Sequence, residues 1–527
     1  MEFKDMLNKL RTEKKLSQSK LADKLGVSHQ AVQKWESGET TPDVEKVIKI
    51  ANFFGVTIDY LLHGTSARAS EALMHQKTLR PSYAELHPWE LYSECLKAEY
   101  RQCTEEGLDI DTYKDVFASI SELPRGHHKT ALANVLFDIV NSAKYADSYP
   151  YFEPSEYNAI CKVRNSWTLP STPLDHTQLK AKIEGAWYGR ICGCLLGKPI
   201  EGIRTNELLP LLKETNNYPL SRYLLNADMI DSVCSKYHFP LAGRCYADNI
   251  TCAPADDDTN YTVLYQKIVD DYGRNFTPAN VADAWMHYQP KNAYCTAERV
   301  AFRNFVAGYR PPQSASYQNP FREWIGAQIR GDYFGYINPG DPETAAEMAW
   351  RDASITHTKN GIYGEMFVAA MLAAAAVSDN LTDIMQAGLS QIPVHSRLYQ
   401  AIIRIMELHS KGISQKDCFA DIHKRWDEHN EHDWCHTISN AEIVVASLLY
   451  GNNDYARSIC MAVQTGFDTD CNGATVGSIL GMKNGIQSIG EEWIAPVNGK
   501  LNTAIFGIET VDIASLIEKT MEHIRQK

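Results

Sequence analysis

Long hydrophobic runs and an organised cysteine pattern are both missing from this sequence. The most apolar stretch, residues 366–377, is rich in alanine and too short to cross a bilayer, so it is expected to form a core helix. Thirteen cysteines are scattered without a Cys-x-x-Cys pair. The odd number of cysteines and the absence of an N-terminal leader predict a protein of the reducing cytoplasm without a membrane partner.

An excess of positive charge is missing as well. The 527 residues carry a net charge of −13, which argues against a chain that coats nucleic acid along its whole length. The charge is uneven, because residues 1–65 contain ten Lys and Arg against nine Asp and Glu. A small, nearly neutral head is therefore expected on a larger acidic body.

Alternating strand patterns are rare in the body, whose segments have helical patterns separated by Gly, Pro and Asn turns. We predict an all-α protein, and the length of the chain suggests about two to four domains. The connecting region carries no recognisable chemistry and is expected to serve as a brace or as a dimerisation layer. The expected parts are a head at 1–64, a linker at 65–85, a helical connecting region at 86–178, the body at 179–512 and a C-terminal helix at 513–527.

Two capped helices lie close together in the head. Ser17 is placed to cap a helix over 18–25, Gly26 turns the chain, and Ser28 is placed to cap a second helix that ends near Glu36. A later helix is expected after Pro42 with a buried stripe of Val44, Val47, Ile48 and Ala51. The whole order resembles the phage-repressor and Xre class of helix-turn-helix domains.

That resemblance implies contacts to operator DNA. In such domains the second helix of the pair enters the major groove, led by its N-terminal residues. The alternative is a protein-docking module with a solvated polar face. A head of low charge binds DNA weakly as a monomer, so a homodimer that contacts two half-sites is expected. The residues expected to contact DNA are Gln18, Ser28, His29, Gln30, Gln33 and Lys34.

Two acidic runs mark the body. Asp256, Asp257 and Asp258 precede one helical pattern, and Asp468 and Asp470 precede another some two hundred residues later. Alone, the first run would be a helix cap or a solvated loop. Together, the two runs suit a hard divalent cation, which prefers oxygen ligands.

Glycines recur at four-residue spacing in two stretches of the body. Gly477, Gly481 and Gly485 follow the second acidic run, and a similar series occupies 185–197. Such a spacing leaves one face of a helix without side chains, which allows a neighbouring helix to approach closely.

Four ordered motifs resemble the ADP-ribosylglycohydrolase family over about 180–510. They are the glycine series that ends in Lys198-Pro199-Ile200-Glu201, the Asp256–Thr259 run, Ser354-Ile355-Thr356-His357, and Asp468-Thr469-Asp470-Cys471-Asn472. One alone would be weak, whereas four in order are specific. The resemblance implies an orthogonal helical bundle that hydrolyses an ADP-ribosyl bond in a protein, a nucleic acid or a small conjugate.

The resemblance also implies two Mg²⁺ or Mn²⁺ ions and the groups that serve them. Asp256 stands where many members have Thr, and Cys471 stands where Thr is common, which leaves open a less fully ligated second ion, a preference for Mn²⁺ or a weakened enzyme. Glu201 matches the family's loop glutamate, which is otherwise simply an exposed residue. The expected metal ligands are Asp256, Asp257, Asp258, Asp468, Asp470 and Cys471, and the expected catalytic residues are Glu201, Asp257 and Asp470.

A substrate-binding set follows from the same resemblance. A glycine loop at 326–332 is expected near the diphosphate, aromatic residues after it are expected to stack on adenine, and the Ser-x-x-His segment is expected to line the site, although a lone histidine is often structural. The expected residues are Gly326, Gln328, Arg330, Tyr333, Ser354 and His357. The histidine-rich stretch at 428–436 fits no standard metal spacing and is interpreted as a polar loop.

Two functions from different classes fit these patterns. The first is a metal-dependent hydrolase joined to a DNA-binding head. The second is a transcriptional regulator whose hydrolase-like body senses ADP-ribose or a relative without turnover.

Overall fold

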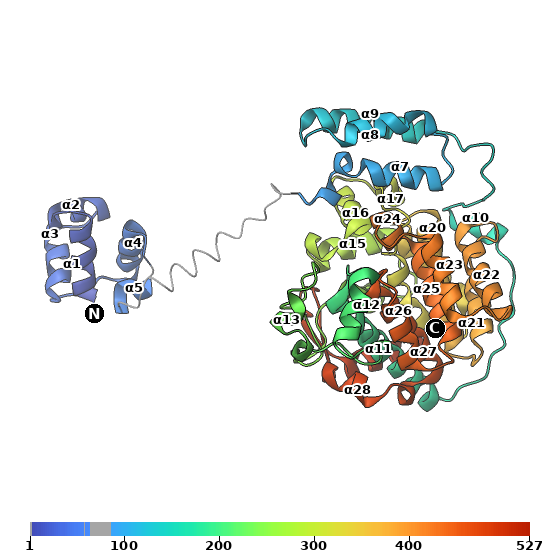
Figure 1. Ribbon diagram of the computed structural model, residues 1–527. Coiled ribbons are helices and arrows are strands. Elements are labelled where there is room, and N and C mark those ends of the chain that lie inside the picture. Colours follow the sequence, from blue (N-terminus) through green and yellow to red (C-terminus); the bar gives the residue numbers. More distant parts are fainter. Residues whose placement is uncertain (1–2, 57, 64–85, 527) are drawn as a thin grey trace. The chain divides into compact units, whose positions relative to one another are not determined.

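The computed structural model describes residues 3–56, 58–63 and 86–526, and these fall into two compact units (Figure 1). The expected linker at 65–85 lies outside the described residues. The first unit is the head, and the second, from His87 onward, holds the connecting region and the body. Each unit is described by itself.

The head consists of short helices around a core of its own. Ser17 and Ser28 cap α2 and α3 as expected, each accepting a backbone N–H at 3.2 Å. The stripe expected on α4 is partly wrong, because Val44 and Ile48 are exposed while Ile50 and Phe54 are buried beside Val47 and Ala51. The helices are α1 (Phe3–Glu13), α2 (Gln18–Leu25), α3 (His29–Ser37), α4 (Val44–Phe54) and α5 (Ile58–His63).

The connecting region forms a helical layer on the body. In Figure 1, α8 and α9 lie over α7 at one end of the large unit. A small core joins α7, α8 and α9, with Leu96, Phe117 and Leu136 among its members. The elements of the layer, which we call the 87–163 layer, are η1 (Pro88–Glu90), η2 (Tyr92–Glu94), α7 (Leu96–Glu105), η3 (Asp111–Tyr113), α8 (Lys114–Ser121), α9 (His127–Ser142) and α10 (Tyr157–Val163).

Buried ion pairs fasten this layer to the body. Arg322 of the body contacts Glu99 at 2.9 Å and Glu106 at 2.6 Å, and Lys359 contacts Glu106 at 2.8 Å. Glu153, which follows the layer's α9, contacts Arg397 at 2.9 Å. Charges taken out of water need such partners, so the layer and the body form one folded unit.

The body is a bundle of helices around a single large core, as the sequence predicts. Every residue of α20 is buried, including the alanine-rich stretch from Met366. α29 packs into the same core, since Trp187 of α11 donates to Thr520 at 3.0 Å, so this C-terminal helix belongs to the body. Of the described residues, the named strands are β1 (Lys500–Asn502) and β2 (Thr510–Asp512), which pair antiparallel. The longer helices are α11 (His176–Gly197), α12 (Thr205–Glu214), α14 (Asp257–Tyr272), α15 (Pro278–Tyr288), α16 (Thr296–Val306), α19 (Pro342–Ala353), α20 (Lys359–Ala375), α21 (Leu381–Leu389), α22 (Arg397–Ser410), α23 (Gln415–Arg425), α25 (Thr437–Tyr450), α26 (Tyr455–Val463), α27 (Thr469–Asn484) and α29 (Ile513–Arg525).

Short helices and single turns connect these. They are η4 (Lys198–Ile200), η5 (Asn226–Asp228), α13 (Asp231–Cys234), η6 (Lys291–Ala293), α17 (Gln313–Ser316), η7 (Gln328–Arg330), α18 (Asp332–Tyr336), α24 (Glu431–Cys435), η8 (Ile486–Ser488), α28 (Glu491–Ile494) and η9 (Ala495–Val497). Within the described ranges, no helix is long and apolar enough to cross a membrane.

The glycine series of α11 and α27 pack directly against each other. A Cβ on Gly189 would meet the carbonyl oxygen of Gly477 at 2.2 Å, and one on Gly193 would meet that of Gly473 at 2.0 Å. Backbone therefore touches backbone along the pair, as the four-residue spacing predicts. The contact brings the end of α11 beside the start of α27, where Asp468 and Asp470 lie.

Candidate functional site

The two acidic runs meet in one pocket of the large unit. Asp256 is the N-cap of α14 and Asp468 is the N-cap of α27, so both runs sit at helix N-termini, whose dipoles favour negative charge. The pocket is lined by the carboxyl groups of Glu201, Asp257, Asp468 and Asp470 and by Cys471, together with Trp89, Arg204, Trp324, Trp434 and Gly326 among others.

Oxygen atoms without partners face this acidic centre. Oδ2 of Asp258 and Oδ1 of Asp470 are buried and hydrogen-bond to no described residue. Ligand atoms of Asp258, Asp470 and Cys471 lie within 4.8 Å of one another, and so do those of Glu201, Asp468 and Asp470. Leaving buried carboxylate oxygens unsatisfied is costly, and a cation with a preference for oxygen would satisfy them.

The electrostatics of the pocket agree with that geometry. Burial raises the pKa of Asp257, Asp258, Asp468 and Asp470 well above its ordinary value, and neighbouring carboxylates add to the effect. Burial and the same carboxylates raise the pKa of the Cys471 thiol, which keeps its proton. The oxygen set therefore fits Mg²⁺ or Mn²⁺, whereas the protonated thiol is a poor ligand for Mg²⁺.

Asp256 differs from the other carboxylates because both of its oxygens are engaged. Oδ1 accepts the backbone N–H of Asp258 at 2.9 Å, and Oδ2 contacts Nζ of Lys198 at 2.5 Å. Burial opposes ionisation, yet the Lys198 ammonium holds the pKa of Asp256 below its ordinary value. Lys198 was not expected in the site, although it stands three residues before Glu201.

Asp258 is held by a buried arginine. Arg190 of α11 donates Nη2 to Oδ1 of Asp258 at 3.1 Å and Nε to its carbonyl oxygen at 2.9 Å. The Nη1 atom of the same guanidinium lies 2.9 Å from Asp332. This clamp aims one oxygen of Asp258 away from the arginine and leaves the other without a protein partner.

Glu201 sits at the exposed edge of the acidic centre. It follows η4 directly after α11, so the glycine contact with α27 sets its place. The Asp470 carboxylate raises the pKa of Glu201 well above its ordinary value. A glutamate at the edge of a pocket with a pKa above its ordinary value is suited to proton transfer.

Of the six expected substrate residues, only Gly326 lines the pocket. A Cβ there would meet Oε1 of Glu298 at 2.0 Å. Glu298 binds Nη1 of Arg330 at 2.8 Å and lies 3.9 Å from Nε2 of His357. Arg330 and His357 thus support the pocket wall from behind. Gln328 and Ser354 are buried as well and do not border the pocket.

The expectation that Tyr333 binds a ligand is corrected by its burial. Its ring is fully enclosed in the core, and its hydroxyl lies 2.6 Å from Nδ1 of His523 on α29. The neighbouring Phe334 and Tyr336 are enclosed in the same way. The aromatic pattern after the glycine loop packs the bundle and offers no face to a ligand.

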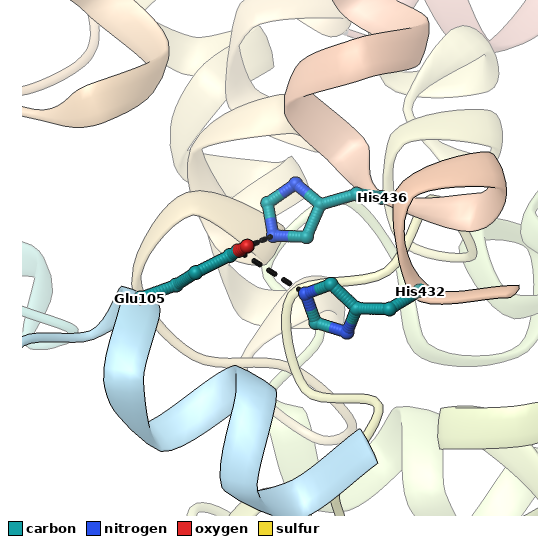
Figure 2. A group of neighbouring side chains, drawn as sticks. All are labelled: Glu105, His432 and His436. Atoms are coloured by element: carbon teal, nitrogen blue, oxygen red, sulfur yellow. Dashed lines mark hydrogen bonds and ion pairs between the residues drawn. The ribbon is translucent and has the colours of Figure 1, made fainter. Parts of the chain in front are cut away.

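The histidine-rich stretch is not the polar loop that the sequence suggested. His432 and His436 are buried, and both rings face Glu105 of α7 (Figure 2). Nε2 of His432 lies 3.1 Å from Oε2 of Glu105, and Nε2 of His436 lies 3.5 Å from it. The spacing alone could not reveal this cluster because Glu105 lies far away in the sequence.

Hydrogen bonds assign the protons of this cluster. Nδ1 of His432 accepts the indole N–H of Trp324 at 3.1 Å, and Nδ1 of His436 accepts the backbone N–H of Ile438 at 3.1 Å. Each neutral ring therefore carries its proton on Nε2, toward Glu105. A nitrogen that carries a proton has no lone pair for a metal, so we interpret the cluster as a hydrogen bond between His432 and Glu105 with His436 in a longer contact, its Nε2 forming no hydrogen bond with the described residues.

The recognition surface of the head is exposed as the resemblance implies. Ser28, His29, Gln30, Gln33 and Lys34 are all exposed on or beside α3. Gln18 is different, because it donates to Oε2 of Glu36 at 2.7 Å, and Arg11 binds the same carboxylate. Gln18 thus braces the start of α2 against the end of α3.

Comparison with known proteins classifies the body. The ADP-ribosylglycohydrolase family matches residues 175–526, more than half of the chain. The chain belongs to the ADP-ribosylglycohydrolase family. Another protein, from Archaeoglobus fulgidus, is 21% identical over 322 residues, which cover 60% of this chain and 91% of that protein. A solved structure described as an ADP-ribosylglycohydrolase-related protein complex gives a TM-score of 0.40 at 16% identity and covers 66% of this chain and 99% of that chain.

The head matches a helix-turn-helix family over residues 7–61. The HTH-type transcriptional activator BcrR of Enterococcus faecalis is 52% identical over 64 residues, 12% of this chain and 31% of BcrR, so the chain spans about a third of that relative. The SPbeta prophage-derived HTH-type regulator YonR of Bacillus subtilis is 37% identical over 106 residues, 19% of this chain and 98% of YonR. This ADP-ribosylglycohydrolase-family protein therefore carries a helix-turn-helix DNA-binding domain. The whole 87–163 layer lies between the two family matches and belongs to neither.

Proposed function

We propose that the body hydrolyses the bond between an ADP-ribosyl group and its acceptor, with Mg²⁺ or Mn²⁺ bound in the acidic pocket. The observation that carries this proposal is the pair of buried, unpartnered oxygens on Asp258 and Asp470. Asp257, which lines the same pocket, and Asp468 complete the set of oxygen ligands. Asp256 contributes less to the ions because Lys198 already neutralises it.

The reaction needs water to replace the acceptor at the anomeric carbon of ribose. Divalent ions would lower the pKa of a bound water and orient the ribose hydroxyl groups. Glu201 gives its proton to the departing acceptor, which takes the electron pair of the broken bond. Glu201 then receives the proton that the water loses as the new C–O bond forms, so protons balance. Asp257 and Asp470 orient the water by their carboxylates.

Release of ADP-ribose tests this proposal. The full chain is incubated with ADP-ribosylated protein, nucleic acid and small conjugates, with Mg²⁺ or Mn²⁺ and with excess EDTA. We expect release with the ions and none after chelation. Asp470→Asn should lower turnover at least about 100-fold, because even groups that only support metal ligands change activity 10- to 100-fold. Asp147→Asn, an exposed carboxylate on the 87–163 layer, serves as the matched control.

Turnover that persists after complete chelation would contradict the metal-dependent mechanism. Equal turnover of Asp470→Asn and the wild type would contradict the assignment of the pocket. Failure to release ADP-ribose from every conjugate tried, by a folded protein that binds the ions, would contradict the hydrolase function.

The second candidate function is a ligand-responsive regulator without turnover. It is supported by Cys471, whose protonated thiol suits Mg²⁺ poorly, and by the Asp256–Lys198 pair. Under this proposal, ADP-ribose changes the affinity of the head for its operator while no conjugate is cleaved. A gel shift with and without ADP-ribose, done beside the release assay, separates the two functions.

We further propose that the head binds operator DNA as part of a homodimer. Its described residues carry little net charge, and a head of this kind neutralises few phosphates. Two heads joined through their bodies gain from a high effective concentration. Light scattering of the full chain, alone and with DNA, measures the stoichiometry, and a complex with one chain per operator would contradict the proposal.

A further inference from the structure

Arg204 lies in the acidic pocket without a salt bridge, and the carboxylates of Glu428, Asp468 and Glu431 act on it only from a longer distance. It lines the pocket, and its guanidinium forms no ion pair or hydrogen bond with any described side chain. Its Nη1 atom is buried without a partner. The guanidinium carbon lies 4.3 Å from the centre of the Trp434 ring. An arginine held in this way keeps its hydrogen-bond donors unused.

Trp434 adds another unused donor at the same place. The ring lines the pocket, and its indole N–H is buried without an acceptor among the residues that the structure describes. A buried indole N–H usually finds a partner. Two buried donors without partners, one of them charged, thus lie beside each other in the pocket. An electron-rich acceptor would satisfy both.

A further ring comes from outside the matched family range. Trp89 of η1 also lines the pocket. The turn that carries it is fixed, because Glu90 accepts the backbone N–H of His87 at 2.8 Å and pairs with Lys291. Arg299 supports the ring, with its guanidinium carbon 5.5 Å from the ring centre. The 87–163 layer therefore contributes directly to the pocket.

The layer also fixes another wall of the pocket indirectly. Trp324 donates its indole N–H to His432, and His432 directs Nε2–H to Glu105 of α7 (Figure 2). The carboxylate sets the tautomer of the imidazole, and the tautomer leaves Nδ1 free to accept the indole. Indole walls and an unpaired guanidinium thus share a pocket with the carboxylates.

We propose that Arg204, with the Trp434 N–H, binds a phosphate group of the substrate, and that Trp89 stacks on its nucleobase. This inference rests on the proposed function, in which the carboxylate end of the pocket takes the ribose that reacts. A guanidinium is the side chain best suited to bind phosphate oxygens, and an indole offers a large face to a base. Arg204 is the cation that lines the described pocket, so a phosphate group would find its positive charge and free donors there.

Equilibrium binding to two ligands tests each half of the inference. ADP-ribose contains phosphates and a base, whereas ribose 5-phosphate contains a phosphate and no base. Both are titrated into the full chain with Mg²⁺ by calorimetry. We expect Arg204→Gln to weaken the binding of both ligands by about tenfold or more. Trp89→Leu should weaken the binding of ADP-ribose by about tenfold, while the affinity for ribose 5-phosphate changes less than about twofold. Trp89→Phe should restore much of the affinity for ADP-ribose.

Matched controls are available on exposed parts of the same unit. Arg310→Gln and Trp167→Leu remove an exposed guanidinium and an exposed indole away from the pocket, and neither should change the affinity for either ligand. Equal losses for both ligands in Trp89→Leu would overturn the base-stacking role. Unchanged binding in Arg204→Gln, or no binding of ribose 5-phosphate to the wild type at millimolar concentration, would overturn the phosphate role.

The outcomes also separate this inference from the proposed hydrolase function. A wild-type chain that binds ADP-ribose through these residues but releases none would contradict the hydrolase and support the inference. A chain that releases ADP-ribose normally after both substitutions would support the hydrolase and overturn the inference.

Discussion

At the scale of single residues, we expect Cys471 to influence which metal ion the pocket prefers. Its protonated thiol lies within 4.8 Å of ligand atoms of Asp258 and Asp470. A hydroxyl there would give Mg²⁺ an oxygen ligand in place of sulfur. We predict that Cys471→Thr raises the affinity for Mg²⁺ about tenfold, or about 1.4 kcal/mol, and changes that for Mn²⁺ less, as measured by calorimetry.

The control for this prediction is Cys245→Thr. Cys245 is half-buried and does not line the acidic pocket, so its replacement should leave the affinity for either ion unchanged. A Cys471→Thr protein that binds Mg²⁺ no better than the wild type would show that this position does not contact the ion.

His436 makes the stability of the body depend on pH. Burial lowers its pKa from 6.5 to about 4, so between these values the unfolded chain binds a proton that the folded chain does not. The free energy of unfolding therefore falls as the pH drops from about 6.5 to 4, at about 1.4 kcal/mol per pH unit and by about 3 kcal/mol in all. A protonated ring also loses the acceptor that caps Ile438.

We predict that His436→Asn flattens this pH dependence. Asparagine caps a helix well and does not titrate, so the melting temperature should fall less on acidification than that of the wild type. Scanning calorimetry from pH 7.5 to pH 4.5 measures the difference. His287→Asn, an exposed histidine, is the control and should follow the wild type. Parallel curves for His436→Asn and the wild type would mean that His436 is not the group that titrates.

The sequence predicted some of these residues and not others, for a physical reason. The carboxylates follow from local spacing, because two acidic runs that each precede a helical pattern together suit a divalent cation. Arg204 carries no such signal, since only the folded chain shows that its buried Nη1 atom has no hydrogen-bond partner among the described residues. The expectation that Tyr333 binds a ligand was wrong because an aromatic residue at helical spacing packs a core more often than it binds a ligand.

At the scale of elements, the contact between α11 and α27 holds the pocket together. A Cβ on Gly477 would lie 2.1 Å from the carbonyl oxygen of Gly189, and backbone on both sides cannot yield as a side chain would. We predict that Gly477→Ala lowers the free energy of unfolding by about 3 kcal/mol, the upper part of the range for overpacking, and weakens binding of Mg²⁺. Thermal unfolding and calorimetry measure the two effects.

A glycine in open space supplies the control. Gly126 precedes α9 and a Cβ there meets nothing within 4 Å, so Gly126→Ala should leave the binding of ions unchanged. If Gly477→Ala melts and binds Mg²⁺ like the wild type, the helices do not need their backbone contact.

The helical pattern predicted the elements better than their buried faces. On α4, Val44 and Ile48 satisfy a helical period as well as Ile50 and Phe54 do, and the sequence does not say which stripe meets the rest of the head. The glycine series had no such ambiguity, because only one face of each helix lacks side chains. Their pairing was therefore foreseeable from spacing, whereas the burial of His432 against the distant Glu105 was not.

At the scale of the whole molecule, we expect the head and the body to act independently, so that a substitution in the head leaves the activity of the body unchanged. Gln30 and Gln33 are exposed on α3 and each is suited to bind adenine with two hydrogen bonds. We predict that replacing both by Ala removes the preference for the operator, about 1–3 kcal/mol for each contact, while release of ADP-ribose is unchanged. Selection from random duplexes should yield half-sites about 10 bp apart, or a multiple of this.

Gln313→Ala on the body is the control for the head variant and should bind the selected duplex normally. No enriched sequence at low salt, from a folded dimer, would leave the head as a module that docks proteins. Loss of hydrolysis in the head variant would show that the two units are not independent.

The buried ion pairs between the 87–163 layer and the body limit how this protein can be shortened. A chain that began at the family boundary, residue 175, would keep Arg322 and Lys359 but lose their carboxylate partners Glu99 and Glu106, whereas Arg397 would lose Glu153 and keep Glu323. Leaving a buried charge without its partner costs about 3–5 kcal/mol, so two such charges approach the stability of a typical domain. The ADP-ribosylglycohydrolase domain is thus not a separable module: we expect it to fold only together with the 87–163 layer, whereas the head has a core of its own.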